Sequence, residues 1–576
     1  MAELLQKKTR LEMKKFLGAG LLIMIAIPAF AENYLLNGGQ ASQINYEMIQ
    51  KIRPSHGTRS LVLSYVLPES FDSPTYRQKI RDLSLRFSPE PSKRKERTDI
   101  RGNKVLDVTW KTPTKAVTTT ICLTALNSVN LQTLKTSAPF PLSRFPKHVK
   151  VYLKSTQQVN VNDQGIRGKA RELTVPASTE FDAVQRVLTW VVDHMQYVLT
   201  PKRFDAIYAF QNGRGNCQNY SHLSAALLRA VGIPVRIVNG ITLKQPYDIK
   251  IGDNTLTMKM AQGRHSWIEV YFPDLGWVPF DPQGTELFVS NRFIRIEVGL
   301  DNNETIQDGL IRWTQTRGMS GEPQLEEKIY SGFLDDQVKL YARKTDYGPR
   351  KLLLCPQIET VFSKIPVSPP PPLPPKLPKK ELQRLRYVKP HVFGNLEFPE
   401  NVDFLSAYGP ARLGAEGTME MRKNFLVETA EYVTTQGKQY AQTFILNKPL
   451  QLQKVGLALH KFSDDGQLWL ELVQDNDGKP GNPISASDIL TLKQVPFTPG
   501  YSWVDFDFSK SSVILSPGRY WVALGFTGSP IVNWFFSYGK PVGPMDGTRY
   551  KMIFDASWSR SLAYEFNYRI SGLAAE

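Results

Sequence analysis

Apolar and polar residues alternate with the period of β-strands in the first part of the chain. The runs at 59–67, 104–110 and 118–124 show this alternation most clearly. A strand with this pattern buries one face and exposes the other. Cys122 lies within the third run, where it is interpreted as a small apolar residue. We therefore expect an N-terminal β domain at residues 32–145.

The spacing of apolar residues then changes to a helical period. Such residues recur every three or four positions at 184–192 and again at 220–231, which predicts two amphipathic helices. Gly232 and Pro234 are typical of the end of the second helix. Three strands are expected after it: 235–238, 265–272 and 277–280. The turn at 273–276 contains Pro and Gly, which favours a tight reversal between the last two strands.

A proline-rich stretch at 366–380 is expected to form an extended, semi-rigid linker. Beyond it, alternating strands are predicted at 467–473, 503–508 and 519–524, as in a β-sandwich or jelly roll. The sequence Asp475-Asn476-Asp477-Gly478 is interpreted as a turn between strands. A calcium loop of the EF-hand type needs Glu at its twelfth position, and Ala486 stands there.

The first 31 residues predict a secretory signal peptide. Met13-Lys14-Lys15 is basic, residues 17–29 are almost wholly apolar, and Ala29-Phe30-Ala31 places small residues where a signal peptidase reads. The apolar run is shorter than the roughly 20 residues of a membrane span, and Pro28 interrupts it. An uncleaved anchor is the alternative. We expect an exported protein, periplasmic or secreted, that starts at Met1 or Met13.

Composition and charge narrow the class of protein. Among 576 residues, 41% are hydrophobic and 22% charged, which excludes wholesale disorder, collagen and coiled coil. The net charge of +17 favours anionic surroundings. We therefore expect peripheral association with an anionic envelope surface, no nucleic-acid partner and a monomer. The basic run at 93–97 is interpreted as a solvated loop. Three cysteines are too few for a disulfide framework or a four-Cys zinc site.

Cys217 is the candidate nucleophile. It follows the Gly-rich turn Gly213-Arg214-Gly215-Asn216 and opens the second predicted helix. Free amides and the helix dipole at such a position stabilise a thiolate and also receive an oxyanion. A thiolate that attacks an acyl carbon needs a partner that protonates the leaving amine. That partner is usually a His oriented by a carboxylate or amide.

His265 is the best placed of the seven histidines to be this partner. His222 lies on the same helix as Cys217 and points away, and the other five lie outside the motifs. The hairpin that follows His265 ends at Asp281. A four-residue loop would place Asp281 on the face away from His265. A five-residue loop, or a bulge in the first strand, places both side chains on one face. We expect such an irregularity.

Three motifs together resemble the transglutaminase-like superfamily, a papain-like cysteine enzyme core, in its bacterial secreted type. They are a Gly-x-Cys opening a helix that ends in Gly-Ile-Pro-Val-Arg, His-x-Trp-x-Glu-Val at 265–270 and Gly-Trp-x-x-Phe-Asp-Pro at 276–282. The resemblance covers residues 175–285. It implies Cys217 as nucleophile, His265 as general acid and base, and Asp281 as the residue that orients the imidazole.

The resemblance also implies a second oxyanion donor. Papain-like enzymes place a Gln six residues before the Cys, and Gln211 stands there; a plain surface Gln is the alternative. The chain has no Gly-x-Ser-x-Gly, Walker loop or His-Glu-x-x-His. We therefore expect no cofactor and no metal.

The expected fold class is α+β and multidomain, with a papain-like transglutaminase core flanked by an N-terminal β domain and a C-terminal β-sandwich. The expected units are a signal peptide (1–31), an N-terminal β domain (32–145), the catalytic core (146–300), an extension of uncertain structure (301–365), the proline-rich linker (366–380) and a jelly-roll-like binding domain (381–576).

Two classes of function remain open. The first is an exported cysteine enzyme that forms a thioester, with a protein or peptide substrate that includes cell-envelope material as a candidate. A hydrolase, meaning a protease or amidase, is the leading reading, and a true transglutaminase passes the acyl group to an amine instead. The second class is a non-catalytic envelope scaffold whose two β regions bind partners.

Overall fold

The computed structural model describes residues 33–576 with short gaps. The gaps are 285–286, 351–352, 368–371, 397–403, 409–410, 414–417, 422, 429, 436, 498–500, 529–530 and 542–546. The expected signal peptide and part of the expected linker lie outside the described residues. The chain is strand-rich, with 51% strand and 13% helix. None of the helices within the described ranges has the length and apolar character that crossing a membrane requires.

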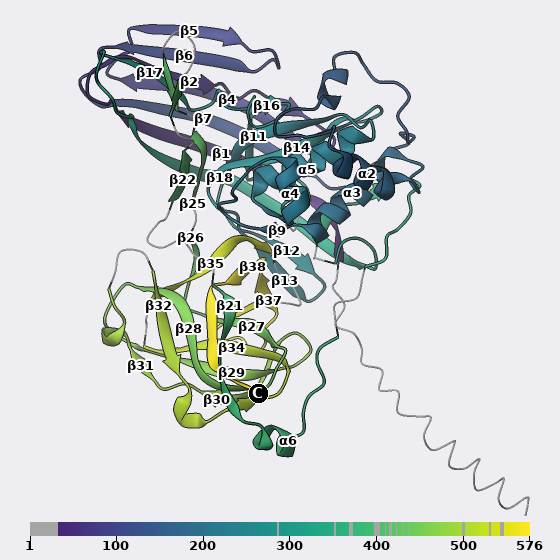
Figure 1. The fold of residues 1–576 in the computed structure, drawn as a ribbon, viewed down its shortest axis with the longest axis vertical. Helices are drawn as coiled ribbons and strands as arrows, with labels where there is room; N and C mark the ends of the chain where they lie inside the picture. The colour runs from purple at the N-terminus through teal and green to yellow at the C-terminus, as the bar shows by residue number, and fades with distance from the viewer. Residues whose placement is uncertain are drawn as a thin grey trace, which may run out of the picture.

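The N-terminal region consists of two packed sheets (Figure 1). Apolar side chains from both sheets, such as Leu63, Val108 and Ile121, meet in one core cluster. The strands predicted at 59–67, 104–110 and 118–124 are present as β2, β6 and β7. The strands of this region are β1 (Asn33–Arg53), β2 (Thr58–Val66), β4 (Tyr76–Ser88), β5 (Lys93–Thr98), β6 (Lys104–Lys111) and β7 (Val117–Asn130).

The interpretation of the basic run at 93–97 as a loop was wrong. These residues form β5, which pairs with β6 from Lys93↔Thr109 to Thr98↔Lys104. Almost all of its side chains are exposed, so the run has the polarity of a loop. Its backbone nevertheless completes the edge of the sheet, because backbone pairing does not require an apolar side chain on an edge strand.

Two later strands complete the N-terminal sheets. β18 (Gln324–Thr345) pairs antiparallel with β1 from Gln324↔Arg53 to Thr345↔Asn33. β17 (Leu310–Gln315) pairs with β2. The region expected at 301–365 as an extension of uncertain structure therefore supplies strands to the sheets of the N-terminal region.

The core joins four helices to a small antiparallel sheet (Figure 1). The central helix, α5 (Cys217–Ala230), contacts the other three helices and two strands of this sheet, and its residues from Cys217 to Arg229 are all buried. The helices predicted at 184–192 and 220–231 are α3 and α5. The remaining elements are α2 (Gln164–Thr174), α3 (Glu180–His194), α4 (Ala206–Asn212), β11 (Val235–Thr242), β14 (Gly263–Phe272), β15 (Gly276–Phe280) and β16 (Phe293–Gly299).

The C-terminal region again consists of two packed sheets. The strands predicted at 467–473, 503–508 and 519–524 are β29 (Gln467–Asp475), β32 (Ser502–Asp507) and β34 (Gly518–Thr527). The turn predicted after Asp475 joins β29 to β30 (Pro480–Ala486), with Asp475 paired to Pro480.

Strand pairing crosses the unit boundaries expected from the sequence. β24 (Met419–Met421) pairs with β17, and β25 (Lys423–Glu428) pairs with β14 at Gly263↔Val427. β37 (Arg560–Leu562) pairs with β13 (Asn254–Met258) of the core. Segments beyond the proline-rich stretch therefore extend sheets of both earlier regions.

Candidate active site

Cys217 is the first residue of α5. Asn216 caps the helix, because its side chain accepts a hydrogen bond from the Gln218 amide at 3.1 Å. The Asn219 side chain accepts in turn from the Asn216 amide at 3.2 Å. These reciprocal bonds fix the start of the helix. A side chain at Gly215 would meet the Asn219 side chain at 2.2 Å, so the turn before the Cys requires glycine.

The hairpin of β14 and β15 decides on which face Asp281 lies. Phe272 pairs with Gly276, and Ile268 pairs with Phe280, so the connecting loop has three residues. Continued by one residue, this register places Asp281 opposite Trp267, on the same face as His265. The expected shift of register is present, but a loop shorter by one residue produces it. Gly276, with φ +74°, allows this short loop because it adopts a left-handed conformation.

His265 and Asp281 are hydrogen-bonded. The Nε2 atom of His265 lies 2.8 Å from Oδ2 of Asp281, and each residue is 1% exposed. The imidazole stacks on Trp267 with 6.1 Å between ring centroids and meets the Phe293 ring edge-on at 5.5 Å. These contacts leave the ring little freedom to rotate.

Cys217 is brought to the same imidazole. Burial by itself lowers the pKa of His265, because it disfavours the charged form. The charge of Asp281 and the hydrogen bonds with Asp281 and Cys217 outweigh burial and raise this pKa to about 10. Since Nε2 is bound to Asp281, Nδ1 is the nitrogen left for the thiol. The three residues named from the sequence therefore meet, and the imidazolium is the stable form at neutral pH.

The structure does not bring Gln211 to this cluster. Gln211 is exposed near the end of α4 and lines a surface hollow with His194, Gln196 and Arg214. None of the residues Cys217, His265 and Asp281 lines that hollow.

Tyr197 is a residue that the sequence analysis missed. It lies on β9 (Gln196–Tyr197), which pairs with β10 (Arg214–Gly215) directly before Cys217. Burial first, and then the neighbouring Cys217 and Tyr220, raise its pKa well above the usual value. Its hydroxyl therefore stays protonated beside Cys217. In the sequence alone, a single Tyr 20 positions before the Cys gives no indication that its hydroxyl lies beside the thiol.

His222 has a structural role, as its position on the helix predicted. Its Nε2 accepts a hydrogen bond from the Asn302 amide at 3.2 Å, so its Nδ1 donates to the carbonyl of Phe204 at 2.6 Å. Burial lowers the pKa of this imidazole. His222 is therefore a neutral link between α5 and two loops.

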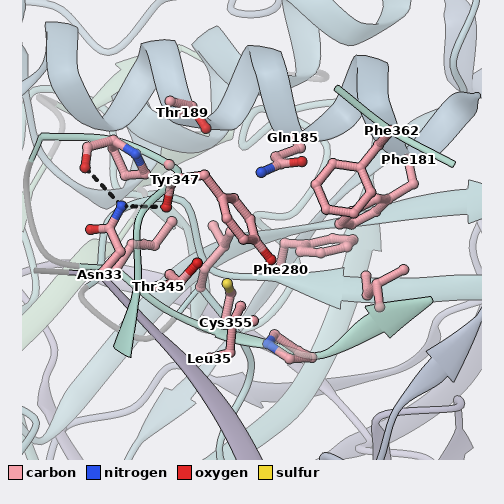
Figure 2. A pocket seen from close by; sticks show the side chains of 16 residues that line it. Asn33, Leu35, Phe181, Gln185, Thr189, Phe280, Thr345, Tyr347, Cys355 and Phe362 are labelled. Atoms are coloured by element: carbon pink, nitrogen blue, oxygen red, sulfur yellow. Dashed lines mark hydrogen bonds between the residues drawn. The ribbon is translucent and has the colours of Figure 1, made fainter. Parts of the chain in front are cut away.

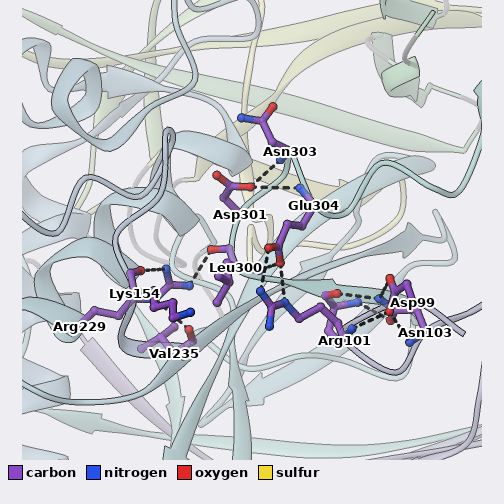
Figure 3. Close-up of polar contacts among 11 residues, drawn as sticks. Asp99, Arg101, Asn103, Lys154, Arg229, Val235, Leu300, Asp301, Asn303 and Glu304 are labelled. Atoms are coloured by element: carbon purple, nitrogen blue, oxygen red, sulfur yellow. Dashed lines mark hydrogen bonds and ion pairs between the residues drawn. The ribbon is translucent and has the colours of Figure 1, made fainter. Parts of the chain in front are cut away.

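The other end of α5 is held by a buried arginine (Figure 3). Arg229 is 3% exposed and donates to the carbonyl oxygens of Val235 at 3.0 Å, Lys154 at 2.9 Å and Leu300 at 2.7 Å. Nearby, Arg101 binds both carboxylate oxygens of Glu304. These bonds tie the helix to β11 and to two loops, which fixes the helix that carries Cys217.

An apolar cavity lies beside Phe280, the last residue of β15 (Figure 2). Phe280, directly before Asp281, lines it together with Phe181, Gln185 and Cys355, and its volume is about 40 Å³. Burial raises the pKa of Cys355 to about 12. The Cys355 thiol therefore stays protonated at neutral pH. Within the described ranges, no three His, Cys, Asp or Glu side chains gather as a metal site would need.

Comparison with known proteins finds a family that this region resembles. The model of the Transglutaminase-like superfamily matches residues 167–282. The "Uncharacterized protein YebA" of Bacillus subtilis is 30% identical over 125 residues, which are 20% of this chain and 17% of that protein. The Protein-glutamine gamma-glutamyltransferase of Pseudomonas aeruginosa is 33% identical over 75 residues, which are 13% of this chain and 11% of that protein.

A solved structure from Cytophaga hutchinsonii, described as a candidate cysteine protease, aligns with 54% of this chain and 95% of its own, at 16% identity and a TM-score of 0.38. The present chain spans less than half the length of the curated relatives that it matches. Residues 167–282 of this chain are therefore similar to the transglutaminase-like superfamily.

Proposed function

We propose that the chain is an exported cysteine enzyme that acts on peptide or amide bonds through a thioester at Cys217. One observation carries the proposal: the His265–Asp281 pair, bonded at 2.8 Å, contacts a thiol at the start of a buried helix. A nucleophile, a proton carrier and an orienting carboxylate are the parts that acyl transfer requires.

In the first half-reaction, Cys217 has passed its thiol proton to His265, and the thiolate Sγ attacks the acyl carbon and forms the C–S bond. The carbonyl oxygen becomes an oxyanion, which the Cys217 amide and the Tyr197 hydroxyl receive as hydrogen-bond donors. The imidazolium of His265 then gives its proton to the leaving nitrogen as the C–N bond breaks. The products are a free amine and a thioester.

In the second half-reaction, His265 accepts a proton from the incoming nucleophile, which attacks the thioester carbon. The C–S bond breaks, and the sulfur leaves as a thiolate beside the imidazolium. With water as the nucleophile the product is a carboxylic acid, and with an amine it is a new amide. We propose water, so that the enzyme is a protease or amidase, periplasmic or secreted, with peptide or envelope material as substrate.

The test compares the wild type with Cys217→Ala on a library of peptides derived from a whole proteome. We expect cleavage by the wild type alone. A second arm adds a fluorescent primary amine and a protein rich in accessible Gln. Incorporation of the amine faster than hydrolysis would replace the hydrolase proposal with amine transfer. Absence of both reactions in the wild type would favour a binding scaffold.

A further inference from the structure

One face of the N-terminal region carries a surplus of positive charge. Strands β4, β7, β1 and β18 lie side by side in that order. One face of this sheet packs on the apolar core. The other face presents the alternate side chains of all four strands, which are exposed or half-buried. We call it the outer face.

Cations follow β4 along its length. Arg77, Lys79 and Arg81 are exposed at alternate positions, and a bulge between Arg81 and Ser84 keeps Arg86 on the same side of the sheet. Alternate residues of a strand lie about 7 Å apart. β4 therefore presents a column of four cations. The first three are about 7 Å apart, and Arg86 lies about 14 Å beyond Arg81, because Ser84 stands between them.

Further cations, Lys51 and Lys328 among them, lie on the other side of the outer face. The register places Arg86, Thr120, Ile49 and Lys328 in one row across the four strands, so Lys328 is about 14 Å from the β4 column. Lys51 lies on β1, two positions from Ile49. The outward residues of β7 lie between these two groups of cations.

The outward side of β7 is rich in hydroxyl groups. Thr120 pairs with Arg86, Thr124 with Arg81 and Ser128 with Arg77. Each hydroxyl both donates and accepts hydrogen bonds. The outward residues of β7 therefore form a polar column beside the charged one.

Most carboxylates near the outer face are already engaged. Asp72 binds Arg77 at 3.0 Å and Glu326 binds Arg53 at 2.9 Å, while Glu47 accepts from the Cys122 thiol at 3.8 Å. Asp82, in the bulge, and Asp335, on β18, are the remaining acids. Over the part of the chain that the structure describes, no ion pair occupies the following cations: Lys51, Lys79, Arg81, Arg86 and Lys328.

We propose that the outer face binds a linear acidic polysaccharide. Its carboxylates or sulfates meet the cation column of β4, and its hydroxyls meet the hydroxyl column of β7. A single-stranded nucleic acid needs aromatic platforms for its bases. β4 and β7 present none outward, and the exposed Tyr330 and Tyr341 lie on β18, across β1 and β7 from the cation column. A bilayer needs protruding apolar side chains, and Leu126 is the one large aliphatic residue among the outward positions of these two strands. The proposal is independent of the chemistry at Cys217.

The experiment measures binding of the full chain to immobilised polygalacturonate at low salt. The test variant is Lys79→Glu/Arg81→Glu/Arg86→Glu. The control variant reverses three exposed charges elsewhere, Lys389→Glu/Lys448→Glu/Lys454→Glu. We expect the wild type and the control to bind alike, the test variant to bind about tenfold or more weakly, and added salt to weaken wild-type binding. Cys217→Ala should bind like the wild type, which separates this proposal from the catalytic one.

If the test variant does not fold, Lys79→Gln/Arg81→Gln/Arg86→Gln takes its place. We expect this variant to bind polygalacturonate about threefold more weakly than the wild type does. The proposal is overturned if the wild type fails to bind polygalacturonate, or if the test and control variants bind alike. It is also overturned if oligothymidylate or vesicles of phosphatidylglycerol bind the outer face more tightly than polygalacturonate does.

Discussion

Asp281 controls the proton on His265, and this control can be measured. In Asp281→Asn the charge that raises the pKa of His265 to about 10 is gone. The burial that lowers this pKa then prevails. With a neutral imidazole the sulfur keeps its proton, and a thiol is a weaker nucleophile than the thiolate. We therefore expect kcat to fall by about 100-fold to 10,000-fold at neutral pH, and its decline on the alkaline side to begin at lower pH.

Asp274→Asn is the matched control for this pH profile of kcat. Asp274 lies in the loop of the same hairpin, but its carboxylate binds Thr136 and Ser137 instead of an imidazole. The profile of this variant should follow the wild type. An Asp281→Asn variant with an unchanged alkaline decline would show that another group sets the protonation of His265.

Glu180 makes stability depend on pH. Both of its carboxylate oxygens are buried without a hydrogen-bond partner. Burial, with a smaller contribution from Asp274, raises its pKa to about 9. The unfolded chain loses this proton near pH 4.5 while the folded chain keeps it, so folding becomes less favourable as pH rises from 4.5 toward 9.

Glu180→Gln removes this dependence. We expect the difference in free energy of unfolding, variant minus wild type, to grow by about 2–3 kcal/mol between pH 4.5 and pH 7. Denaturant titrations at the two pH values measure it. Glu172→Gln, at an exposed position of α2, should show a change below about 0.5 kcal/mol. A constant difference for Glu180→Gln across this range would contradict the buried, protonated carboxyl.

At the scale of elements, the sequence predicted those parts of the site that a single short segment determines. Turn residues and helical spacing indicated α5 and its Cys, and the β14–β15 hairpin followed from Pro273 and Gly276. Loop length was not predicted, because three-residue and five-residue loops give the same face to Asp281. The position of Gln211 outside the cluster has a related reason. Its offset from the Cys is a chain distance, and α4 ends between them.

The hairpin offers a test of this geometry. An added Cβ at Gly276 meets no atom within 4 Å, but its φ of +74° strains any other residue. Gly276→Ala should therefore cost about 1 kcal/mol through the backbone alone. Gly168→Ala is the control, because Gly168 lies in α2 with equally open space and should gain about 0.5–1 kcal/mol. Equal effects of the two changes would contradict the left-handed turn.

Arg229 tests how the helix of Cys217 is held. Lysine cannot reach three carbonyl oxygens that lie in different directions. Arg229→Lys should lower the free energy of unfolding by about 2–4 kcal/mol. Arg101→Lys keeps a single ion pair with Glu304 and should cost about 1 kcal/mol or less. Denaturant titration of both variants measures the two losses of unfolding free energy. A smaller loss for Arg229→Lys than for Arg101→Lys would show that Arg229 does not anchor α5.

At the scale of the whole molecule, the division into three regions stays a prediction, and the sequence patterns did not indicate how distant strands pair. β1 and β18 pair along their full lengths although most of the chain's first half separates them. Strands after the proline-rich stretch extend the earlier sheets. Pairing between distant segments leaves no local pattern, because either face of a strand accepts many partners. Turn residues and composition therefore indicate where regions begin and end, but strands pair across these boundaries.

The central claim is that Cys217 is an activated nucleophile, and alkylation tests it most directly. The full chain is exposed briefly to iodoacetamide at neutral pH, and peptide masses report the labelling of each Cys. We predict that Cys217 is labelled before Cys122 and Cys355, although it is only 5% exposed, and that His265→Ala slows this labelling alone. Labelling of Cys122 ahead of Cys217, or an equal rate in His265→Ala, would contradict the claim.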